Sequence, residues 1–154
     1  MVLSRADALA KPMLELDLAS AAYIAGLVDG EGTVTLTRLH RHEQRRLVLT
    51  ISNNELPLLT FVRDAVGAGR ITGKRTYSVR HAPSYTYQIT SRQALSLLRQ
   101  ILPLMRSYKV HRASLAIEHY VALTPRNGRY TGDRLARRKE FEEGFLAIRY
   151  SRKR

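Results

Sequence analysis

The sequence predicts an α+β domain in which four antiparallel strands have helices on one face and leave the other face bare. Residues 33–40 and 46–53 alternate apolar and polar side chains, which is the period of half-buried strands. A segment with helical spacing precedes each of two strand pairs, so the chain repeats a helix–strand–strand plan. Its 154 residues are enough for one domain with a substantial core.

The first helix is expected to end at about residue 28, after an N-terminal arm that Pro12 keeps from being helical. Asp17 or Ser20 can cap this helix, because a short polar side chain accepts a backbone N–H at a helix start. Glycines flank Glu31 where the helix gives way to the first strand. Glycine tolerates backbone angles that other residues resist, so we expect a turn here.

The first two strands form a hairpin around a polar turn at residues 41–45. Val34 and Leu36 point to one side of the first strand. Leu47, Leu49 and Ile51 do so in the second strand, and all five are expected in the core. The opposite face, made of hydroxyls and arginines with one valine, would hold Thr33, Thr35, Thr37, Arg46, Val48, Thr50 and Ser52.

The second half of the repeat begins with a helix that Asn54 can cap and Gly67 stops. Strands are expected at residues 70–78 and 84–90, with a loop at residues 79–83 between them.

Helices are expected in the rest of the chain. Ser91 can cap a third helix, which Pro103 ends or kinks. A fourth helix is expected around residues 113–121, and a basic amphipathic helix at residues 133–150. The chain thus divides into an N-terminal arm (1–19), a core domain (20–123) and a basic C-terminal helical extension (124–154).

The charge is strongly positive, because 26 Lys and Arg residues oppose 13 Asp and Glu residues, for a formal net charge of +13. This excess suits a polyanionic partner, first of all nucleic acid. No acidic residue lies from Ala65 through Ile117, a region that includes the second strand pair. We interpret it as a nucleic-acid surface rather than a merely solvated face. The arginine bias fits this partner, although genomic base composition or a hot habitat would also produce it.

The absence of cysteine excludes disulfides, thiolate metal sites and cysteine nucleophiles. No apolar run approaches the roughly 18 residues of a membrane span. Acids and a proline interrupt the N-terminal segment where a signal peptide would have its apolar core. We therefore expect an intracellular protein without a membrane partner, in a prokaryotic cytoplasm or an organelle.

Residues 24–32, Ile-Ala-Gly-Leu-Val-Asp-Gly-Glu-Gly, resemble the LAGLIDADG motif of the homing endonucleases residue by residue. Ile24, Val28, Gly30 and Glu31 stand where that motif has Leu, Ile, Ala and the second Asp. The strand pattern that follows, and the order of elements from residue 20 to about 123, also resemble that family. The resemblance implies the LAGLIDADG endonuclease fold, an α-β-β-α-β-β-α core whose four-stranded sheet lies in the DNA major groove. The alternative for the motif alone is a buried helix that ends in a glycine turn.

Hydrolysis of a phosphodiester needs a charge-neutralising metal, an activated water and an in-line geometry. The resemblance implies that Glu31, the second acid of the motif, binds this metal, with help from the backbone carbonyl of Gly30. Mg²⁺ is the expected ion, with Mn²⁺ or Ca²⁺ able to take its place, since hard cations take oxygen ligands and keep several waters. The alternative is that Glu31 is a solvated acid at a turn. Asp29 is expected to brace backbone amides at the helix end.

Two more catalytic residues follow from the resemblance alone. Asn53 ends the second strand, where the family often has a polar residue near the metal and water. Lys109 precedes the fourth helix and would stabilise charge or order water. Alternatively, Asn53 belongs to a turn. Lys109 would alternatively be one more surface cation, or the basic position would be taken by Arg106 or Arg112.

A two-stranded ribbon fits the DNA major groove, and its outward side chains reach base edges there. The residues expected to contact DNA are Thr33, Thr35, Thr37, Arg41, Arg46, Val48, Thr50, Ser52, Thr72, Lys74, Thr76, Arg80, Thr86 and Gln88.

The chain has one motif, whereas cutting both DNA strands needs two active sites, so we expect a homodimer. Ala22, Gly26 and Gly30 lie four residues apart on one helix face, and small residues at that spacing let two backbones approach closely. The interface is expected to hold Ala22, Ala25, Gly26 and Asp29 in an isologous contact. Such twofold symmetry implies a pseudo-palindromic target.

These features together predict a homodimeric, Mg²⁺-dependent, site-specific endonuclease of double-stranded DNA. No splicing-type junction chemistry surrounds the motif, so a free-standing intron-encoded enzyme is preferred over an intein. Two alternatives stay open: an RNA-binding maturase on the same fold, and a non-catalytic nucleic-acid-binding regulator. The retained Glu31 favours cleavage over the maturase.

Overall fold

The computed structural model describes residues 13–74 and 78–151. Most of the predicted N-terminal arm lies outside these residues, as does the predicted DNA contact Thr76. The elements are α2 (Leu18–Glu31), β1 (Gly32–Thr37), β2 (Arg46–Asn53), α3 (Leu56–Val66), β3 (Arg70–Lys74), β4 (Ser84–Thr90), α4 (Ser91–Ile101), the 3-10 turn η1 (Leu102–Leu104), α5 (Lys109–His119) and α6 (Gly132–Ala147). This order confirms the α+β class and the helix–strand–strand repeat.

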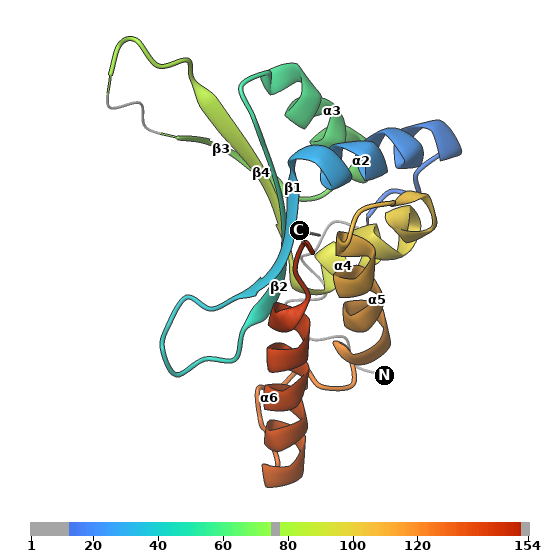
Figure 1. Ribbon diagram of the computed structural model, residues 1–154, viewed down its shortest axis with the longest axis vertical. Coiled ribbons are helices and arrows are strands. Elements are labelled where there is room, and N and C mark those ends of the chain that lie inside the picture. The colour runs from blue at the N-terminus through green and yellow to red at the C-terminus, as the bar shows by residue number, and fades with distance from the viewer. Residues whose placement is uncertain (1–12, 75–77, 152–154) are drawn as a thin grey trace.

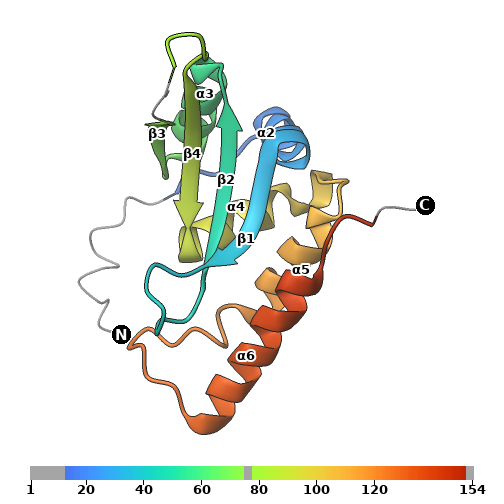
Figure 2. The same cartoon turned by 60° about the vertical axis from the view of Figure 1, so that its left-hand side comes forward.

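The four strands form one antiparallel sheet in the order β1-β2-β4-β3, so the central pair joins the two halves of the repeat. The helices lie on one side of this sheet, and the loops at its two ends curve away on the other side (Figure 1). In Figure 2 the strands stand in front of α3 and α4 with their outer face uncovered. The bare face predicted from the sequence is therefore present in the described part of the chain.

Strand register decides which side chains share the bare face. Thr33 pairs with Thr50, and Thr50 pairs with Gln88. Gln88 in turn pairs with Arg70, which completes a row across all four strands. A second row on the same face holds Ser52, Thr86 and Thr72.

The inward face of the sheet is apolar, as predicted. Val34, Leu36, Leu47, Leu49 and Ile51 are each at most 2% exposed. They form one core with buried residues of every described helix from α2 to α6. The C-terminal extension shares this core, since Phe141 and Phe145 belong to it.

Val48 differs from its expected environment. Its register partners, Thr35 and Thr90, place it on the bare face, yet it is only 5% exposed. Cross-strand neighbours on one face stand close enough to cover a short side chain between them. Val48 therefore offers little surface to a DNA partner.

Helix starts agree with the sequence in one case and differ in two. Asp17 rather than Ser20 caps α2, and its Oδ1 accepts a hydrogen bond from the Ser20 amide at 2.7 Å. The N-cap of α3 is Glu55 instead of Asn54. The N-cap of α4 is Thr90 instead of Ser91. The last two predictions are wrong by one residue, because a preference for short polar side chains does not fix where the backbone turns.

The ends of several elements also differ from expectation. β1 stops at Thr37, so the loop before β2 is longer than predicted. Gly67 ends α3 with a φ of 73°, the left-handed conformation that glycine adopts readily. Pro103 ends α4 inside η1. α6 stops at Ala147, before the predicted end at residue 150. No helix among the described residues is long and apolar enough to cross a bilayer.

Candidate active site and nucleic-acid interface

The junction between α2 and β1 is a turn that only glycine fits. A Cβ on Gly32 would lie 2.7 Å from both the Cα and the carbonyl oxygen of Val28. The Gly32 amide donates to that same carbonyl and closes the helix. Glu31 is the last residue of α2 and is followed at once by β1, so it stands where the helix meets the end of the sheet.

Glu31 is exposed, and within the described residues its carboxylate has no hydrogen-bond or ion-pair partner. A free carboxylate is a ligand that hard divalent cations take. The Gly30 carbonyl is a second candidate oxygen, because it is among the last four of the helix, which have no intrahelical partner. Residues 13–74 and 78–151 contain no group of three or more His, Cys, Asp or Glu that could enclose a metal. Glu31 and Gly30 are thus two oxygen donors, fewer than a divalent cation takes, so an ion held by them would keep several waters.

Asp29 braces the end of α2 against the segment that leads into α5, as predicted. Its Oδ2 accepts a hydrogen bond from the Arg106 amide at 2.8 Å, and its Oδ1 accepts one from the Ser107 amide at 3.0 Å. Burial acts to raise the pKa of Asp29, but these hydrogen bonds and the charge of Lys109 outweigh it and hold that pKa below its usual value. Asp29 is therefore an ionised structural carboxylate.

Lys109 is the first residue of α5 and is only 8% exposed. Its Nζ donates to the carbonyl oxygens of Val28 and Asp29, each at 2.8 Å. Burial lowers the pKa of Lys109, while the negative charges of Asp29 and Glu31 act in the opposite direction. This lysine is a buried cation fixed at the carbonyl end of α2, and not a surface charge.

The two other candidates for the basic position lie elsewhere. Arg106 is exposed, and the contact of its backbone with Asp29 does not involve its guanidinium. Arg112 Nη1 donates to the Val34 carbonyl of β1 at 2.8 Å. Of the three cations, Lys109 is the one whose charge is held at the end of α2.

Asn53 has a structural contact in addition to any catalytic one. Its Oδ1 accepts a hydrogen bond from the Glu55 amide at 2.8 Å, which is typical of the turn that begins a helix. Asn53 lies two residues beyond Ile51, the strand partner of Gly32. It is therefore at the same end of the β1–β2 pair as Glu31, and its catalytic role stays a prediction.

The bare sheet face presents hydroxyls, an amide and cations close to one another. Ser52 Oγ and Thr86 Oγ1 lie 2.9 Å apart and share a hydrogen bond. Arg46, Arg70 and Gln88 line a shallow hollow farther along the face. The Nε of Arg46 is buried and has no partner among the described residues. This guanidinium therefore keeps an unsatisfied donor beside the hollow.

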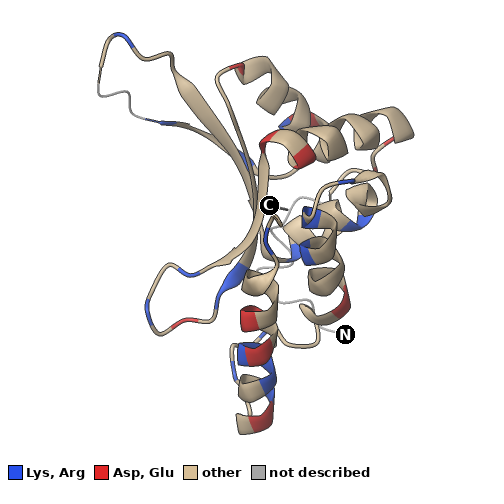
Figure 3. Ribbon diagram, viewed as in Figure 1, with Lys and Arg blue, Asp and Glu red and all other residues tan. Residues whose placement is uncertain are grey.

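Cations gather in the loops at both ends of the bare face, whereas most acidic residues lie on the helices (Figure 3). With the exception of Val48, every predicted DNA contact within the described residues has accessible surface. Those fully exposed are Thr33, Thr37, Arg41, Thr72, Lys74 and Arg80, and those half-buried are Thr35, Arg46, Thr50, Ser52, Thr86 and Gln88.

The predicted dimer face of α2 is exposed, but one of its residues is misplaced. Ala22 and Gly26 are exposed, and Gly30 extends the same face by one turn. A Cβ added to Gly26 would meet nothing within 4 Å. Ala25 is 0% exposed and belongs to the chain's own core, so it offers no surface to a second chain. Its assignment to the interface is wrong, and Asp29 is only half-buried.

An exposed aromatic pair beside this face was not predicted. Tyr23 and Phe61 are 44% and 42% exposed, and their rings meet edge to face with centroids 5.2 Å apart. Leu18, which is 74% exposed, lies on the same helix as Tyr23. Single exposed apolar residues are common. This surface is notable because two exposed aromatic rings from different helices contact each other on it.

Comparison with solved structures finds the same fold in homing endonucleases. I-CvuI, solved with its target in the presence of calcium, gives a TM-score of 0.69 over 88% of this chain and 85% of that chain, at 17% identity. The archaeal intron-encoded I-Vdi141I, complexed with DNA, gives 0.67 over 88% and 87%, at 17% identity. The LAGLIDADG meganuclease I-AabMI, bound to uncleaved DNA, gives 0.59 over 79% and 43%, at 16% identity. No protein-family profile and no curated protein sequence matches this chain.

Proposed function

We propose that this chain, which has the LAGLIDADG homing-endonuclease fold, is a site-specific endonuclease that cuts both strands of DNA with a divalent cation. The position of Glu31 supports this most strongly. An exposed carboxylate without a partner among the described residues stands at the end of a basic, hydroxyl-bearing sheet face. An acid at this place would repel phosphate unless a cation came between them, which favours metal-assisted cleavage over binding alone.

Double-stranded DNA suits the bare face in chemistry as well as in charge. Hydroxyl, amide and guanidinium groups are the side chains that pair with base edges in the major groove. The row Thr33, Thr50, Gln88, Arg70 offers all three across the sheet. The cations of the end loops would contact the phosphates on either side, which supplies affinity without sequence preference.

The chemistry would rest on groups that are already held in place. A divalent cation bound by Glu31 and the Gly30 carbonyl would neutralise phosphate charge and lower the pKa of a bound water. Lys109 uses two of its three donors on the Val28 and Asp29 carbonyls and keeps one for a phosphate oxygen or a water. A cation fixed before charge develops needs no rearrangement during the reaction. Asn53, whose Oδ1 is engaged, would order water through its amide nitrogen.

A homodimer would complete the enzyme, because each chain supplies one Glu31 and each DNA strand needs one active site. The exposed face of Ala22, Gly26 and Gly30 would pack on its twin in an isologous contact. The two Glu31 carboxylates would then lie near the twofold axis. A target with matching pseudo-twofold symmetry follows.

The DNA that flanks the coding region, joined without the coding insert, is the substrate for the test. An intron-encoded homing enzyme recognises the site that its own element interrupts. We expect a double-strand break by the wild type with Mg²⁺, no break without it, and none by Glu31→Gln. Wild-type binding without cutting would indicate a non-catalytic regulator, and preferential binding to the intron RNA would indicate a maturase.

A further inference from the structure

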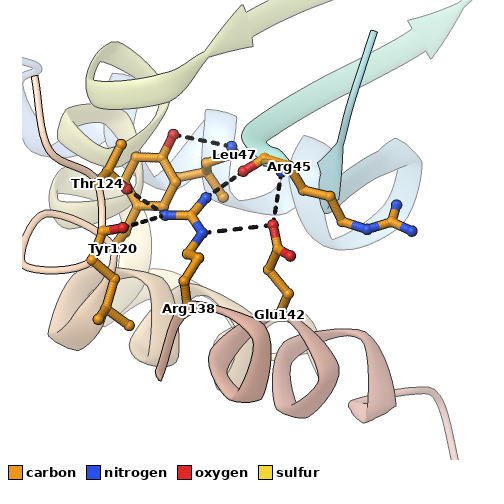
Figure 4. A network of polar contacts seen from close by, with 7 residues as sticks. Arg45, Leu47, Tyr120, Thr124, Arg138 and Glu142 are labelled. Carbon is orange, nitrogen blue, oxygen red and sulfur yellow. Dashed lines mark hydrogen bonds and ion pairs between the residues drawn. The ribbon is translucent and has the colours of Figure 1, made fainter. Parts of the chain in front are cut away.

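The start of β2 is held by side chains from the C-terminal helices (Figure 4). β4 ends at Thr90, opposite Val48. The preceding residues of β2 thus have no neighbour on that edge. Backbone groups of residues two apart point to the same edge of a strand. The edge that lacks a neighbouring strand therefore includes the amide and carbonyl of Arg45 and the amide of Leu47.

All three of these backbone groups are bonded. Oε1 of Glu142 accepts a hydrogen bond from the Arg45 amide at 2.7 Å. Arg138 donates to the Arg45 carbonyl through Nη2. The Tyr120 hydroxyl, at the end of α5, accepts a hydrogen bond from the Leu47 amide at 3.3 Å. Three side chains thus take the place of a missing strand.

The side chain of Arg138 is buried within this contact. It is 1% exposed, and its guanidinium carbon lies 5.0 Å and 5.5 Å from the ring centroids of Tyr120 and Phe141. Nη1 donates to the Leu123 carbonyl at 3.1 Å, and Nε lies 3.6 Å from Glu142 Oε1. A buried cation is costly unless several partners surround it, and this one has them on α6, in the segment that follows α5, and at Arg45 just before β2.

The residue next to this contact is Arg46, which lies on the bare face opposite Thr37, where the β1–β2 pairing ends. Its Nε has no partner among the described residues, so no bond of that nitrogen fixes where the side chain points. The position of this side chain therefore depends on its packing and on the adjacent backbone at Arg45. That backbone is held by α6.

We propose that Glu142 and Arg138 are positioning residues for target recognition: by fixing the backbone at Arg45, they place Arg46 against the base edges that it reads. This inference rests on the proposed function, because it requires that Arg46 contact DNA. It gives the C-terminal helix an effect on sequence choice without any contact of these two residues with DNA. Arg138 and Glu142 face the protein: the Arg45 backbone engages Glu142 Oε1 and Arg138 Nη2, and the Leu123 carbonyl engages Arg138 Nη1.

The test measures binding to a target library in which each base pair of both half-sites is varied. Glu142→Ala should reduce the preference by roughly tenfold at the same base pairs as Arg46→Ala, which is the discrimination of one good base contact. Glu142→Gln keeps the Oε1 acceptor and should retain most of that preference. Glu143→Ala, an exposed acid on the same helix, is the matched control and should bind as the wild type does.

Two further measurements separate positioning from a general loss of stability. At those base pairs, the double variant Arg46→Ala/Glu142→Ala should be no worse than Arg46→Ala, because residues that act through one contact are not additive. In the free protein, Glu142→Ala should speed hydrogen exchange at the Arg45 amide and leave the exchange of core strands unchanged.

The outcomes are distinct. An unchanged preference in Glu142→Ala, or an equal loss for every sequence, overturns the positioning role while the endonuclease proposal stands. A wild type that selects no DNA sequence overturns the proposed function, and the positioning role with it.

Discussion

The ammonium of Lys109 lies 2.8 Å from the backbone carbonyl of Asp29. Lys109 binds the C-terminal end of α2, and Asp29, at that same end, binds the segment that leads into α5. Lys109 puts a positive charge at the carbonyl end of α2, and the Asp29 carboxylate accepts the amides that lead into α5. The charge of Lys109 opposes the partial negative charge at the carbonyl end of α2, and Asp29 satisfies two amides that precede α5. The end of α2, and Glu31 with it, is therefore held rigidly.

Lys109→Met should lower the single-turnover rate of DNA cleavage on the order of 10²-fold, the effect of removing one fixed donor from a site of charge development. DNA affinity should change little, since one of many cations is lost. Arg99→Met, which removes an exposed charge from α4, is the control. Burial lowers the pKa of Lys109, so its ammonium loses its proton at a lower pH than an ordinary lysine does. As the pH is raised, wild-type cleavage should therefore begin to decline earlier than it would with an ordinary lysine. Wild-type rates in Lys109→Met would remove this residue from the mechanism.

Asp29→Asn should lower the free energy of unfolding at neutral pH by about 1–2 kcal/mol, the effect of weakening two hydrogen bonds to a charged acceptor. The pKa of Asp29 is below its usual 3.8 in the folded protein. Its stabilisation is therefore fully present above that value and is lost as the pH falls through the folded-state pKa.

Urea denaturation of Asp29→Asn and wild type should accordingly converge as the solution becomes strongly acidic. Asp64→Asn, an exposed acid on α3, should show no comparable difference at any pH. A gap between Asp29→Asn and wild type that persists unchanged in acid would show that the carboxylate charge is irrelevant.

Glu31→Gln keeps the shape of the side chain and removes its charge, so cleavage should fall on the order of 10³-fold, equivalent to several kcal/mol of metal-assisted stabilisation. DNA affinity should be kept or slightly raised, since an acid near phosphate is gone. Nicking of supercoiled plasmid in Mg²⁺ and a gel-shift titration give the two quantities. Glu140→Gln on α6 is the control, and near-normal cutting by Glu31→Gln would refute the metal assignment.

Gly26→Leu should yield folded monomers. A Cβ at this position meets nothing within 4 Å inside one chain. Glycine is about 0.8–1 kcal/mol less favourable than alanine in a helix, and leucine ranks close to alanine. Thermal stability of the monomer should therefore not fall, while the side chain keeps two α2 helices apart. Light scattering measures the mass, with Ser114→Leu on the exposed side of α5 as control. A stable dimer of Gly26→Leu would place the interface elsewhere.

Arg46→Ala should relax preference at one or two base pairs in each half-site, by roughly 1–3 kcal/mol if the contact is bidentate. The relaxed positions should be mirrored about the target centre. Arg80→Ala, in the exposed loop before β4, should instead weaken all sequences alike and make the salt dependence shallower. A uniform loss in Arg46→Ala would make it a phosphate contact, and a change in one half-site only would contradict the twofold dimer.

Periodicity was enough to predict the elements and the two faces of the sheet. Val34 and Leu36 against Thr33 and Thr35 show an alternation that the strand pairing preserves. The fold likewise follows from the order of the elements, because short connections and an apolar face leave few ways to pack them. Element ends are harder to predict: Glu55 and Thr90 occupy the N-cap positions expected for their neighbours, and neither makes a side-chain capping hydrogen bond.

What the sequence did not give depends on contacts between distant segments. Ala25 and Ala22 are equally small, and only the packing of α2 on the core shows that one is buried and the other exposed. Arg138 reads as one cation in a basic helix, yet it is buried against β2. Lys109 was one of three possible cations until the fold showed which one reaches α2.

The bonds between Lys109 and the end of α2 join residues 80 and 81 positions apart in the chain. Closing so long a loop is slow compared with forming a helix or a hairpin. During synthesis, the residues of all four strands are joined before residue 109 is added, since β4 ends at Thr90. A nascent or truncated chain that ends earlier therefore carries the residues of the sheet face but lacks the ammonium that binds the end of α2. Such a fragment can acquire affinity for a polyanion before it acquires the complete set of groups beside Glu31.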